Sequence, residues 1–378
     1  MPCALRPRPG RHRRLVRAIA LGLVVVGMST ACSAQEIGLR VSGNRLVDSR
    51  GHEIGLRGVN RSGAEYACVS GPGLGLSTFA GPTDKPAIDA MTAWGINAVR
   101  IPLNEDCWLG INGAPRGSTS AAYRAAVVDY VGRLHQAGLY VVLDLHWSAP
   151  GSHLATGQQE MADLDHSPAF WSSVAQTFKD DPFVVFDLYN EPRDISWPCW
   201  RDGCKLSDGW RTVGMQRLVD TVRATGARQP IIVSGIHWST DLSSWLKYRP
   251  RDPANRLIAG IHVFDFSFCG SAACWGDRIA AVARVMPVVV SEVGQRQCDS
   301  DFVGRFADWA EARGISYLGW SWNPAGCRAP SLIDSWDGRP TASGRQLRQR
   351  LRARPPARLG RSEREAVADR WSNAGADR

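Results

Sequence analysis

The chain alternates between continuous apolar runs and segments in which apolar residues recur at helical spacing. Most of the runs are apolar throughout rather than alternating, which is typical of parallel strands covered on both faces. The runs comprise residues 54–60, 96–103, 139–146, 183–190, 231–237, 257–264, 287–294 and 315–322. We therefore expect one buried parallel sheet.

Segments with helical spacing lie between these runs. They comprise residues 85–95, 121–138, 167–180, 210–226, 277–285 and 301–314, and several end at a glycine, a common helix stop. Eight apolar runs with helical segments interspersed between them predict an α/β fold of the closed (β/α)8 TIM-barrel type. An open doubly wound sheet is disfavoured because no G-x-G-x-x-G motif follows the first run.

A short hairpin is predicted ahead of the barrel. Residues 39–53 carry turn signals at 42–44 and at 49–51, with apolar residues between them. We expect this N-terminal hairpin to cover the floor of the barrel.

The ends of the apolar runs carry an unusual set of side chains. Their polar and aromatic residues are Asn60, Arg61, Arg100, His146, Trp147, Asn190, Glu191, His237, Trp238, His262, Glu292, Trp320 and Trp322. Polar residues that merely mark where strands reach solvent would explain some of them. So few acids beside so many histidines and tryptophans favours a functional site on this face, which is where barrel enzymes place their active sites.

Composition and charge narrow the class of protein. The chain has 378 residues, of which 44% are hydrophobic and 21% charged, as expected for a globular protein. The net charge of +9 is concentrated at the two ends, since residues 1–17 carry six arginines without an acid and residues 345–378 carry a net +6. The rest of the chain is slightly acidic, so it offers no basic surface to a nucleic acid. We expect the Arg- and Pro-rich residues 351–378 to be a disordered tail.

The N-terminus predicts export. Arginines precede an apolar stretch at 18–28 that is too short for a membrane span of roughly 20 residues, and small residues follow it. We predict a signal peptide over residues 1–34, cleaved after Ala34, and a secreted catalytic domain over 35–350. The alternative is a cell-envelope lipoprotein with Cys32 acylated, which would contact a membrane only through that lipid. Ser29 stands where such sites usually have leucine, which favours the soluble form.

The cysteines agree with an oxidising destination. Those outside the signal region are Cys68, Cys107, Cys199, Cys204, Cys269, Cys274, Cys298 and Cys327. An even set in an exported chain favours disulfides, although the pairing stays open. If neighbours pair, two bonds join the loops after strands one and two and after strands seven and eight, and two short ones staple the loops after strands four and six. A zinc site is disfavoured because no histidine lies beside the C-x4-C pairs, and we predict no metal and no cofactor.

Two glutamates suggest the chemistry. Glu191 follows the fourth run and Glu292 lies near the end of the seventh, so a closed barrel can bring them to one cleft. Cleavage of a sugar acetal needs such a pair, because one acid protonates the departing oxygen while one carboxylate attacks the anomeric carbon or activates water. The simpler alternative is that each is a lone strand-end charge paired with an arginine.

Six ordered motifs connect the chain to a known family. They are NAVRIPL, VVLDLHW, FDLYNEP, GIHVF, VVVSEVG and LGWSWNP, on the matching strands. With them the chain resembles glycoside hydrolase family 5, the cellulase family of the retaining barrel clan, from about residue 38 to 350. N-E-P alone is a weak signal, but the ordered set is specific.

The resemblance implies roles for the polar residues. Glu191 matches the general acid/base and Glu292 the nucleophile, while Asn190 would bind the sugar 2-hydroxyl and Arg100 would keep Glu292 ionised. We expect the charge of Glu292 to raise the pKa of Glu191, so that a proton is available near neutral pH.

The resemblance also covers the cleft around the pair, with one departure. His146 and His262 match the two cleft histidines, and Trp320 matches the aromatic platform of the eighth strand. The family has His-x-Tyr after the sixth strand, and here the third residue is Phe264. Glu292 would lose a hydrogen-bond donor there unless another group such as Tyr66 replaces it.

The tryptophans bear on the substrate. Trp147, Trp238, Trp320 and Trp322 all follow strands, and flat indole rings suit the apolar faces of pyranose rings. We expect about half of these four to contact sugar and the others to pack in the core, as we also expect of Trp94, Trp171 and Trp309.

The sequence therefore predicts a monomeric exported glycosidase that cleaves a β-linked polysaccharide or oligosaccharide with retention, most like an endo-1,4-β-glucanase. The same mechanism on mannan, β-1,3-glucan or a glycolipid stays open, as does endo or exo action, because specificity lies in loops such as 148–167 and 193–210. Phe264 motivates a third hypothesis, a weakly active carbohydrate-binding protein of the cell wall.

Overall fold

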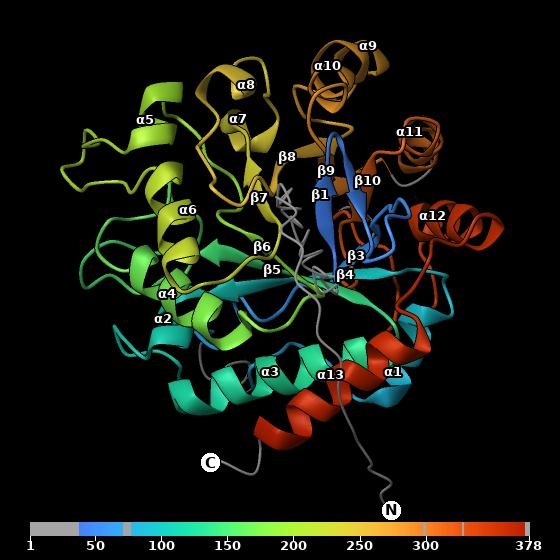
Figure 1. The fold of residues 1–378 in the computed structure, drawn as a ribbon, viewed down its shortest axis with the longest axis horizontal. Helices are drawn as coiled ribbons and strands as arrows, with labels where there is room; N and C mark the ends of the chain where they lie inside the picture. The colour runs from blue at the N-terminus through green and yellow to red at the C-terminus, as the bar shows by residue number, and fades with distance from the viewer. Residues whose placement is uncertain (1–37, 71–76, 298–299, 327–328, 375–378) are drawn as a thin grey trace, which may run out of the picture. The chain divides into compact units, whose positions relative to one another are not determined.

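Eight parallel strands close into a barrel in the computed structural model, which describes residues 38–70, 77–297, 300–326 and 329–374 (Figure 1). The strands are β3 (Arg57–Asn60), β4 (Ala98–Asn104), β5 (Tyr140–Trp147), β6 (Val184–Asp187), β7 (Ile231–Ser234), β8 (Leu257–Phe264), β9 (Val288–Gly294) and β10 (Ser316–Gly319). β10 pairs with both β9 and β3, which closes the ring. The predicted TIM barrel is confirmed, and each predicted apolar run contains one strand.

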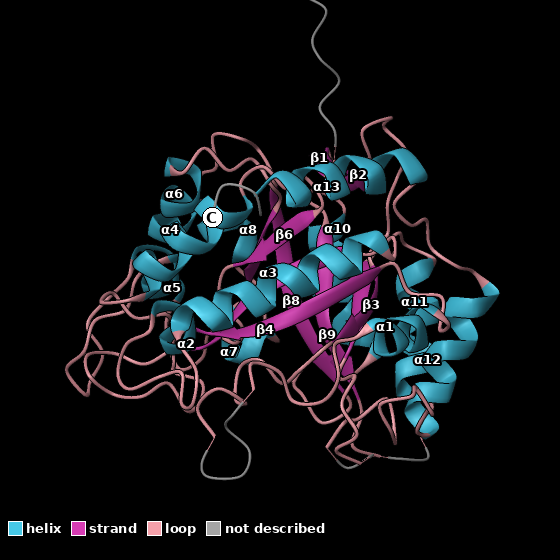
Figure 2. Cartoon of the chain, turned by 90° about the horizontal axis from the view of Figure 1, so that it is seen from below, coloured by secondary structure: helices cyan, strands magenta, loops and turns pink. Residues whose placement is uncertain are grey.

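Helices surround the strands (Figure 2). The longer ones are α1 (Lys85–Thr92), α3 (Ser120–Gln136), α4 (Ser167–Phe178), α6 (Met215–Ala224), α11 (Phe302–Glu311), α12 (Ala342–Ala353) and α13 (Arg361–Ala374). The short ones are α2 (Glu105–Leu109), α5 (Trp197–Asp202), α7 (Ile236–Ser239), α8 (Trp245–Tyr248), α9 (Ala272–Cys274), the π-helix η1 (Trp275–Ile279) and α10 (Ala280–Ala283). Side-chain caps set several starts; for example, the Thr119 hydroxyl accepts from the backbone N–H of Ala122 and begins α3.

The apolar core has two layers. The larger layer fills the space between strands and helices and includes Trp94 and Trp171, as predicted, with Trp309 packed against it. The smaller layer fills the lower barrel interior, where Val142, Val185, Ile232 and Ile258 meet.

The N-terminal hairpin closes the barrel from below. Its strands β1 (Arg40–Ser42) and β2 (Arg45–Val47) pair antiparallel, and Leu39 and Leu46 belong to the interior apolar layer. The backbone N–H of Leu39 also donates to the carbonyl of Pro182, 3.0 Å away, which anchors the hairpin. The predicted cover of the barrel floor is confirmed.

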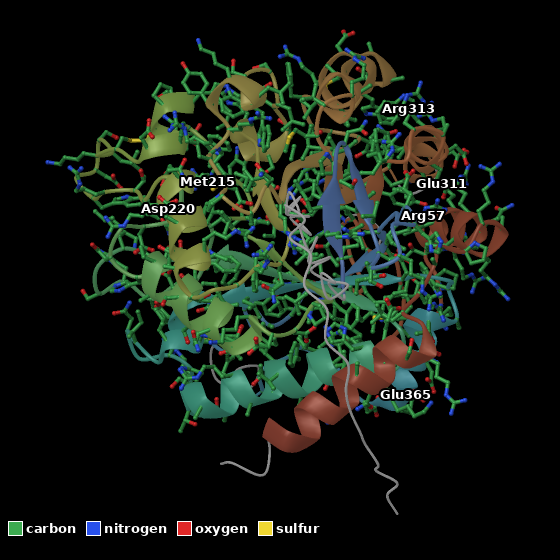
Figure 3. The ribbon with its side chains drawn as sticks, in the orientation of Figure 1. Arg57, Met215, Asp220, Glu311, Arg313 and Glu365 are labelled. Carbon is green, nitrogen blue, oxygen red and sulfur yellow. A yellow bond between two sulfur atoms is a disulfide. The ribbon has the colours of Figure 1, made fainter. Side chains whose placement is uncertain are left out.

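The seam between the first and last barrel strands is held by a polar contact. Arg57 of β3 lies 3.5 Å from Glu311 of α11, and the hydroxyl of Tyr317 in β10 donates to the same carboxylate at 2.6 Å (Figure 3 labels Arg57 and Glu311). One helix thus ties the two strands that close the ring.

The C-terminal segment differs from the expected disordered tail. Residues 361–374 form α13, which packs along α3, and Leu359 and Val367 are buried with the interior apolar layer. The backbone N–H of Leu359 donates to the carbonyl of Gly138 at 3.0 Å. The prediction is wrong for this segment because two well-placed apolar residues suffice to hold it, despite its many arginines.

Disulfides staple the loops after the strands. Cys68 bonds Cys107, Cys199 bonds Cys204, and Cys269 bonds Cys274, as expected if neighbours pair. The expected bond between Cys298 and Cys327 lies outside the described residues, as do the N-terminal segment and Cys32.

No helix in the described part of the chain is long and apolar enough to cross a membrane.

Candidate active site

A charged layer lies directly above the apolar layer inside the barrel. Side chains in a strand alternate between its two faces, so residues two positions beyond an inward apolar residue also face inward. Arg100, Asp144 and Asp187 stand two positions after Ala98, Val142 and Val185, which are inward residues of β4, β5 and β6. All three charged side chains are fully buried.

Arg100 is the centre of this layer. Its Nε lies 2.9 Å from Asp187 Oδ2, its Nη2 lies 3.0 Å from Asp144 Oδ1, and its Nη1 donates to Glu292 Oε1 at 2.8 Å. Burial alone would lower the pKa of Arg100, but the three carboxylates outweigh it and raise that pKa. One cation cannot offset three buried carboxylates. Burial accordingly raises the pKa of both Asp144 and Asp187 to about 7, with Arg100 opposing the rise.

Glu191 and Glu292 lie side by side above Arg100. His262 Nδ1 is 2.8 Å from Glu191 Oε1 and 3.5 Å from Glu292 Oε2. His262 and Glu292 are register partners in β8 and β9, which explains their proximity. One ligand atom from each of the three residues lies within 4.8 Å of the others. Retaining glycosidases place their carboxyl groups about 5 Å apart, whereas inverting enzymes separate them further to admit a water.

The ionisation of this pair differs from the expectation. Burial favours protonation of Glu191, but the hydrogen bond and charge of His262 outweigh it and lower the pKa of Glu191. Burial raises the pKa of Glu292 well above its usual value, and the charge of Glu191 adds to that rise against Arg100. We had expected the charge of Glu292 to raise the pKa of Glu191. In the enzyme without substrate the pKa of Glu191 is lowered instead, because of its contact with His262, which the sequence did not show.

Asn190 is held rigidly beside the pair. Its Oδ1 accepts from Arg100 Nη2 at 2.8 Å, and its Nδ2 lies 3.5 Å from His146 Nε2. His146 Nδ1 in turn contacts Asp144 Oδ2 at 2.6 Å, and the His146 ring stacks on Trp320 with centroids 5.5 Å apart. Burial lowers the pKa of His146 to about 4, so this histidine is neutral at neutral pH.

A cleft of ≈ 860 Å³ opens above these residues. Its lining includes His146, Gln158, Glu191, His237, Trp238, Phe264, Phe266, Phe268, Glu292, Arg296 and Trp320. The structure therefore brings six of the thirteen predicted strand-end residues together at one opening.

The four strand-end tryptophans divide as expected. Trp238 and Trp320 line the cleft. Trp322 does not, because it is 1% exposed and packs edge-on against Trp94 in the core. Trp147 is half-buried with its ring 6.3 Å from that of Tyr66, and it is not part of the described cleft lining. Trp322, one of the four candidates for sugar contact, is therefore a core residue.

The backbone around Trp238 is strained. His237, Trp238 and Ser239 all have φ between 55° and 60°, a left-handed region that costs non-glycine residues about 1–3 kcal/mol each. The Ser239 hydroxyl donates to the carbonyl of Asn190 at 2.7 Å, and the Trp238 N–H donates to the carbonyl of Pro192 at 3.0 Å. These bonds hold Trp238 at the cleft beside the loop that carries Glu191.

Phe264 takes the place of the family's tyrosine at the cleft wall. Its ring stacks on Phe266 at 5.1 Å, so no hydroxyl is offered there. Among the described contacts, the Tyr66 hydroxyl accepts from Asn323 Nδ2 at 2.8 Å and makes no hydrogen bond to Glu292. Glu292 Oε2 instead lies 3.5 Å from Nδ1 of His262.

Several site residues escaped sequence reasoning. Asp144 and Asp187 were detectable, because strand alternation places Asp144 on the same face as His146, two residues later, and Asp187 on the same face as Glu191, four residues later. Gln158, Phe266 and Phe268 come from loops, whose course the sequence pattern does not determine.

Comparison with known proteins assigns the family. The family model described as cellulase (glycosyl hydrolase family 5) matches residues 47–326. The chain belongs to glycosyl hydrolase family 5. It is thus a glycoside hydrolase of a family that acts with retention, and the observed carboxylate spacing agrees.

Individual relatives of this family 5 chain are distant. A mannan endo-1,4-beta-mannosidase of Streptomyces lividans is 24% identical over 79% of this chain and 70% of its own length. An endoglucanase of Microbulbifer sp. (strain ALW1) is 24% identical over 84% of this chain, which spans only 58% of that relative. The crystal structure of a beta-glucanase from Saccharophagus degradans superposes with a TM-score of 0.64 at 20% identity, over 85% of this chain and 94% of that one. This likeness establishes the fold.

Glu191, His262 and Glu292 are also spaced as a metal-binding trio would be. The family assignment and the bond from Arg100 to Glu292 favour the carboxylate pair instead, since a guanidinium already accompanies the buried carboxylate.

Proposed function

We propose that the chain is an exported endo-1,4-β-glucanase in which Glu292 is the nucleophile and Glu191 the general acid/base. The observation that carries this proposal is the proximity of the two carboxylates at the bottom of an open cleft, with Arg100 bonded to Glu292 and His262 to Glu191. In the first step Glu292 attacks the anomeric carbon while Glu191 gives its proton to the departing oxygen. In the second step Glu191 removes a proton from water, which displaces Glu292 from the sugar.

The surrounding residues support these roles. Asn190, fixed by Arg100, would donate from its Nδ2 to the 2-hydroxyl of the reacting sugar. Trp320, half-buried and stacked on His146, would contact the face of the same ring or of its neighbour. Once Glu292 is bonded to sugar its charge vanishes, and the one remaining carboxylate can act as a base.

Cellulose-type substrate is proposed because the Saccharophagus degradans β-glucanase was crystallised with cellotetraose and the Microbulbifer relative is an endoglucanase. Mannan is the second candidate, favoured by the Streptomyces lividans mannosidase. Export follows from the predicted signal peptide, with acylated Cys32 as the alternative that mass spectrometry of the mature N-terminus distinguishes.

The roles are tested with variants at the two carboxylates and an activated aryl β-cellobioside. Glu292→Ala and Glu191→Ala should both lose turnover of β-glucan by about 10³-fold or more. Added azide should restore turnover in both, yielding the α-glycosyl azide with Glu292→Ala and the β-glycosyl azide with Glu191→Ala. Surface variant Glu365→Gln serves as the control. Full activity of Glu292→Ala on β-glucan would sink the assignment.

The substrate is tested by comparing kcat/KM on β-1,4-glucan, β-1,4-mannan and β-1,3-glucan. A preference for β-1,4-glucan is expected. Higher activity on mannan would replace the proposed substrate while retaining the mechanism, and binding to glucan without release of reducing sugar would favour a carbohydrate-binding protein.

A further inference from the structure

Two acidic side chains are buried together outside the cleft. Glu105 begins α2, directly after β4, and Asp163 lies in the loop that joins β5 to α4. Both residues are fully buried, and α2 lies beside α4 (Figure 1). One hydroxyl bridges them, since Ser167 Oγ lies 2.6 Å from Glu105 Oε2 and 3.1 Å from Asp163 Oδ2. We call Glu105 and Asp163 the buried acid pair, and the proposed catalytic mechanism does not use it.

The hydrogen-bond donors around the buried acid pair are too few for two negative charges. Ser167 has one hydroxyl proton, so it donates to only one of the two carboxyl groups. Asp163 Oδ1 accepts from the backbone N–H of His166 at 2.7 Å, but Glu105 Oε1 has no hydrogen-bond partner among the described residues. In the same part of the chain, no arginine, lysine or histidine side chain forms an ion pair with either carboxyl group. An isolated buried carboxylate is so costly that it takes up a proton instead.

The titratable groups nearest the pair do not supply the missing positive charge. Asp106, the next residue of α2, is a third acid, and its charge disfavours ionisation of Glu105. The hydroxyl of Tyr189 and the ring of His166 each bond a backbone carbonyl, at 2.9 and 2.7 Å. Burial first, and then the charge of Asp163 and a hydrogen bond with it, raise the pKa of Glu105 well above its usual value. One proton shared by the pair fits this geometry, because a protonated carboxyl group donates to its neighbour.

The buried acid pair lies where three loops of the catalytic face meet. Asp163 is flanked by two backbone hydrogen bonds of 2.9 Å to residues 211 and 213, which follow β6. The cations of that segment, Lys205 and Arg211, are exposed. The loop of Asp163 also carries Gln158, which lines the cleft. The pair therefore joins the loops after β4, β5 and β6, and the position of Gln158 depends on it.

We propose that Glu105 and Asp163 share one proton and are positioning residues, which hold the loop that carries Gln158 against α2 and lose this hold as pH rises. The direction of the pH dependence follows from where the proton is bound. In the unfolded chain Glu105 ionises above about pH 4.3, whereas in the folded chain it keeps its proton. Each further unit of pH therefore favours the unfolded chain, until the folded carboxyl group ionises too and leaves two buried charges side by side. The pair makes no contact with the cleft, so this role is independent of the proposed hydrolysis.

Thermal unfolding of Glu105→Gln between about pH 5 and pH 9 tests the shared proton. Glutamine keeps a donor to Asp163 but cannot ionise, so the Tm of this variant should lie close to that of the wild type at the acidic end and exceed it increasingly as pH rises. One proton makes the difference grow by roughly 2 °C for each pH unit. Asp163→Asn, which leaves a single ionisable carboxyl group in the pair, should show the same trend and serves where Glu105→Gln does not fold. Asp165→Asn changes an exposed acid of the same loop and is the matched control, which should show no trend.

The infrared band of a protonated carboxyl group is a second readout, which a merely structural role would not change. The wild type at about pH 8 should show such a band that is missing from Glu105→Gln. A Tm difference that stays constant with pH, or that favours the wild type more as pH rises, would mean that Glu105 is ionised in the folded enzyme and would overturn the shared proton. An infrared spectrum that Glu105→Gln leaves unchanged would overturn it as well. Neither readout requires turnover, so failure of the proposed glycosidase activity would be seen separately.

Discussion

At the scale of single residues, four buried carboxyl groups lie close together at the site, so the protonation of each depends on the others. Asp144, Asp187 and Glu292 surround one guanidinium, Glu191 lies beside Glu292, and burial opposes charge on each of the four carboxyl groups. Glu191 and Glu292 are close enough that they titrate as a pair, so the form with a single shared proton is the productive one. A bell-shaped dependence of kcat/KM on pH follows.

Glu191→Gln is expected to move the acidic limb of this profile to lower pH. The limb reports ionisation of Glu292, whose pKa is raised first by burial and further by the charge of Glu191. Removing that negative charge lowers the pKa of Glu292, so the nucleophile ionises at lower pH. The measurement is the pH dependence of the burst of phenolate from an activated aryl glycoside, whose leaving group needs no acid. An exposed-acid variant, Asp89→Asn, should leave the limb in place, and an upward shift with Glu191→Gln would contradict the account.

Phe264→Tyr is expected to raise kcat. The substitution restores the hydroxyl of the family pattern near Glu292, whose Oε2 lies 3.5 Å from Nδ1 of His262. A single well-placed donor at a reacting centre is worth up to about 10²-fold, so a gain on the order of 10-fold is reasonable for one added at an existing site. Phe266→Tyr, a change at the more exposed ring that stacks on Phe264, should give no comparable gain. Loss of activity with Phe264→Tyr would show that the cleft requires an apolar side chain there.

At the scale of helices and strands, the C-terminal helix α13 acts as part of the barrel. It lies along α3 (Figure 1). Leu359, just before it, belongs to the interior apolar layer. Two guanidinium bonds fix the same segment, since Arg358 donates to the carbonyls of Ile96 and Thr92 at 2.8 and 2.6 Å.

Leu359→Ala is therefore expected to lower stability without changing catalysis. Truncation of a buried leucine costs about 2–5 kcal/mol, which for a domain of this size lowers Tm by roughly 5 °C or more. Thermal unfolding followed by circular dichroism measures the shift, and kcat of the folded enzyme should equal that of the wild type. Leu246→Ala removes the same side chain at an exposed position and should change Tm little. An unchanged Tm for Leu359→Ala would mean that the tail is detached in solution.

The strands, the C-terminal segment and Glu191 show which features of the structure could be predicted from the sequence and which could not. The apolar runs predicted every barrel strand because parallel strands need apolar side chains on both faces, and the same alternation could have placed Asp144 and Asp187 inward. The tail was misjudged because composition alone cannot show that Leu359 meets a pocket formed by residues far away in the chain. The lowered pKa of Glu191 could not be predicted from the sequence either, since it depends on the 2.8 Å contact with His262 of a different strand.

At the scale of the whole molecule, the barrel has one functional end. The charged layer, the cleft and the three described disulfides lie at the carboxyl ends of the strands, whereas the hairpin and the apolar layer fill the other end. Separating the two ends lets the loops of the cleft vary while the apolar layer maintains the fold.

The hairpin plug has a consequence for turnover. Leu39 and Leu46 are buried in the interior apolar layer, and side chains fill the interior of an eight-stranded barrel, so the described residues leave no passage through it. Whatever enters the cleft must leave by the same opening. Released sugar and incoming substrate therefore compete for the same cleft. Short cello-oligosaccharides are thus expected to be competitive inhibitors, which raise KM while kcat stays constant.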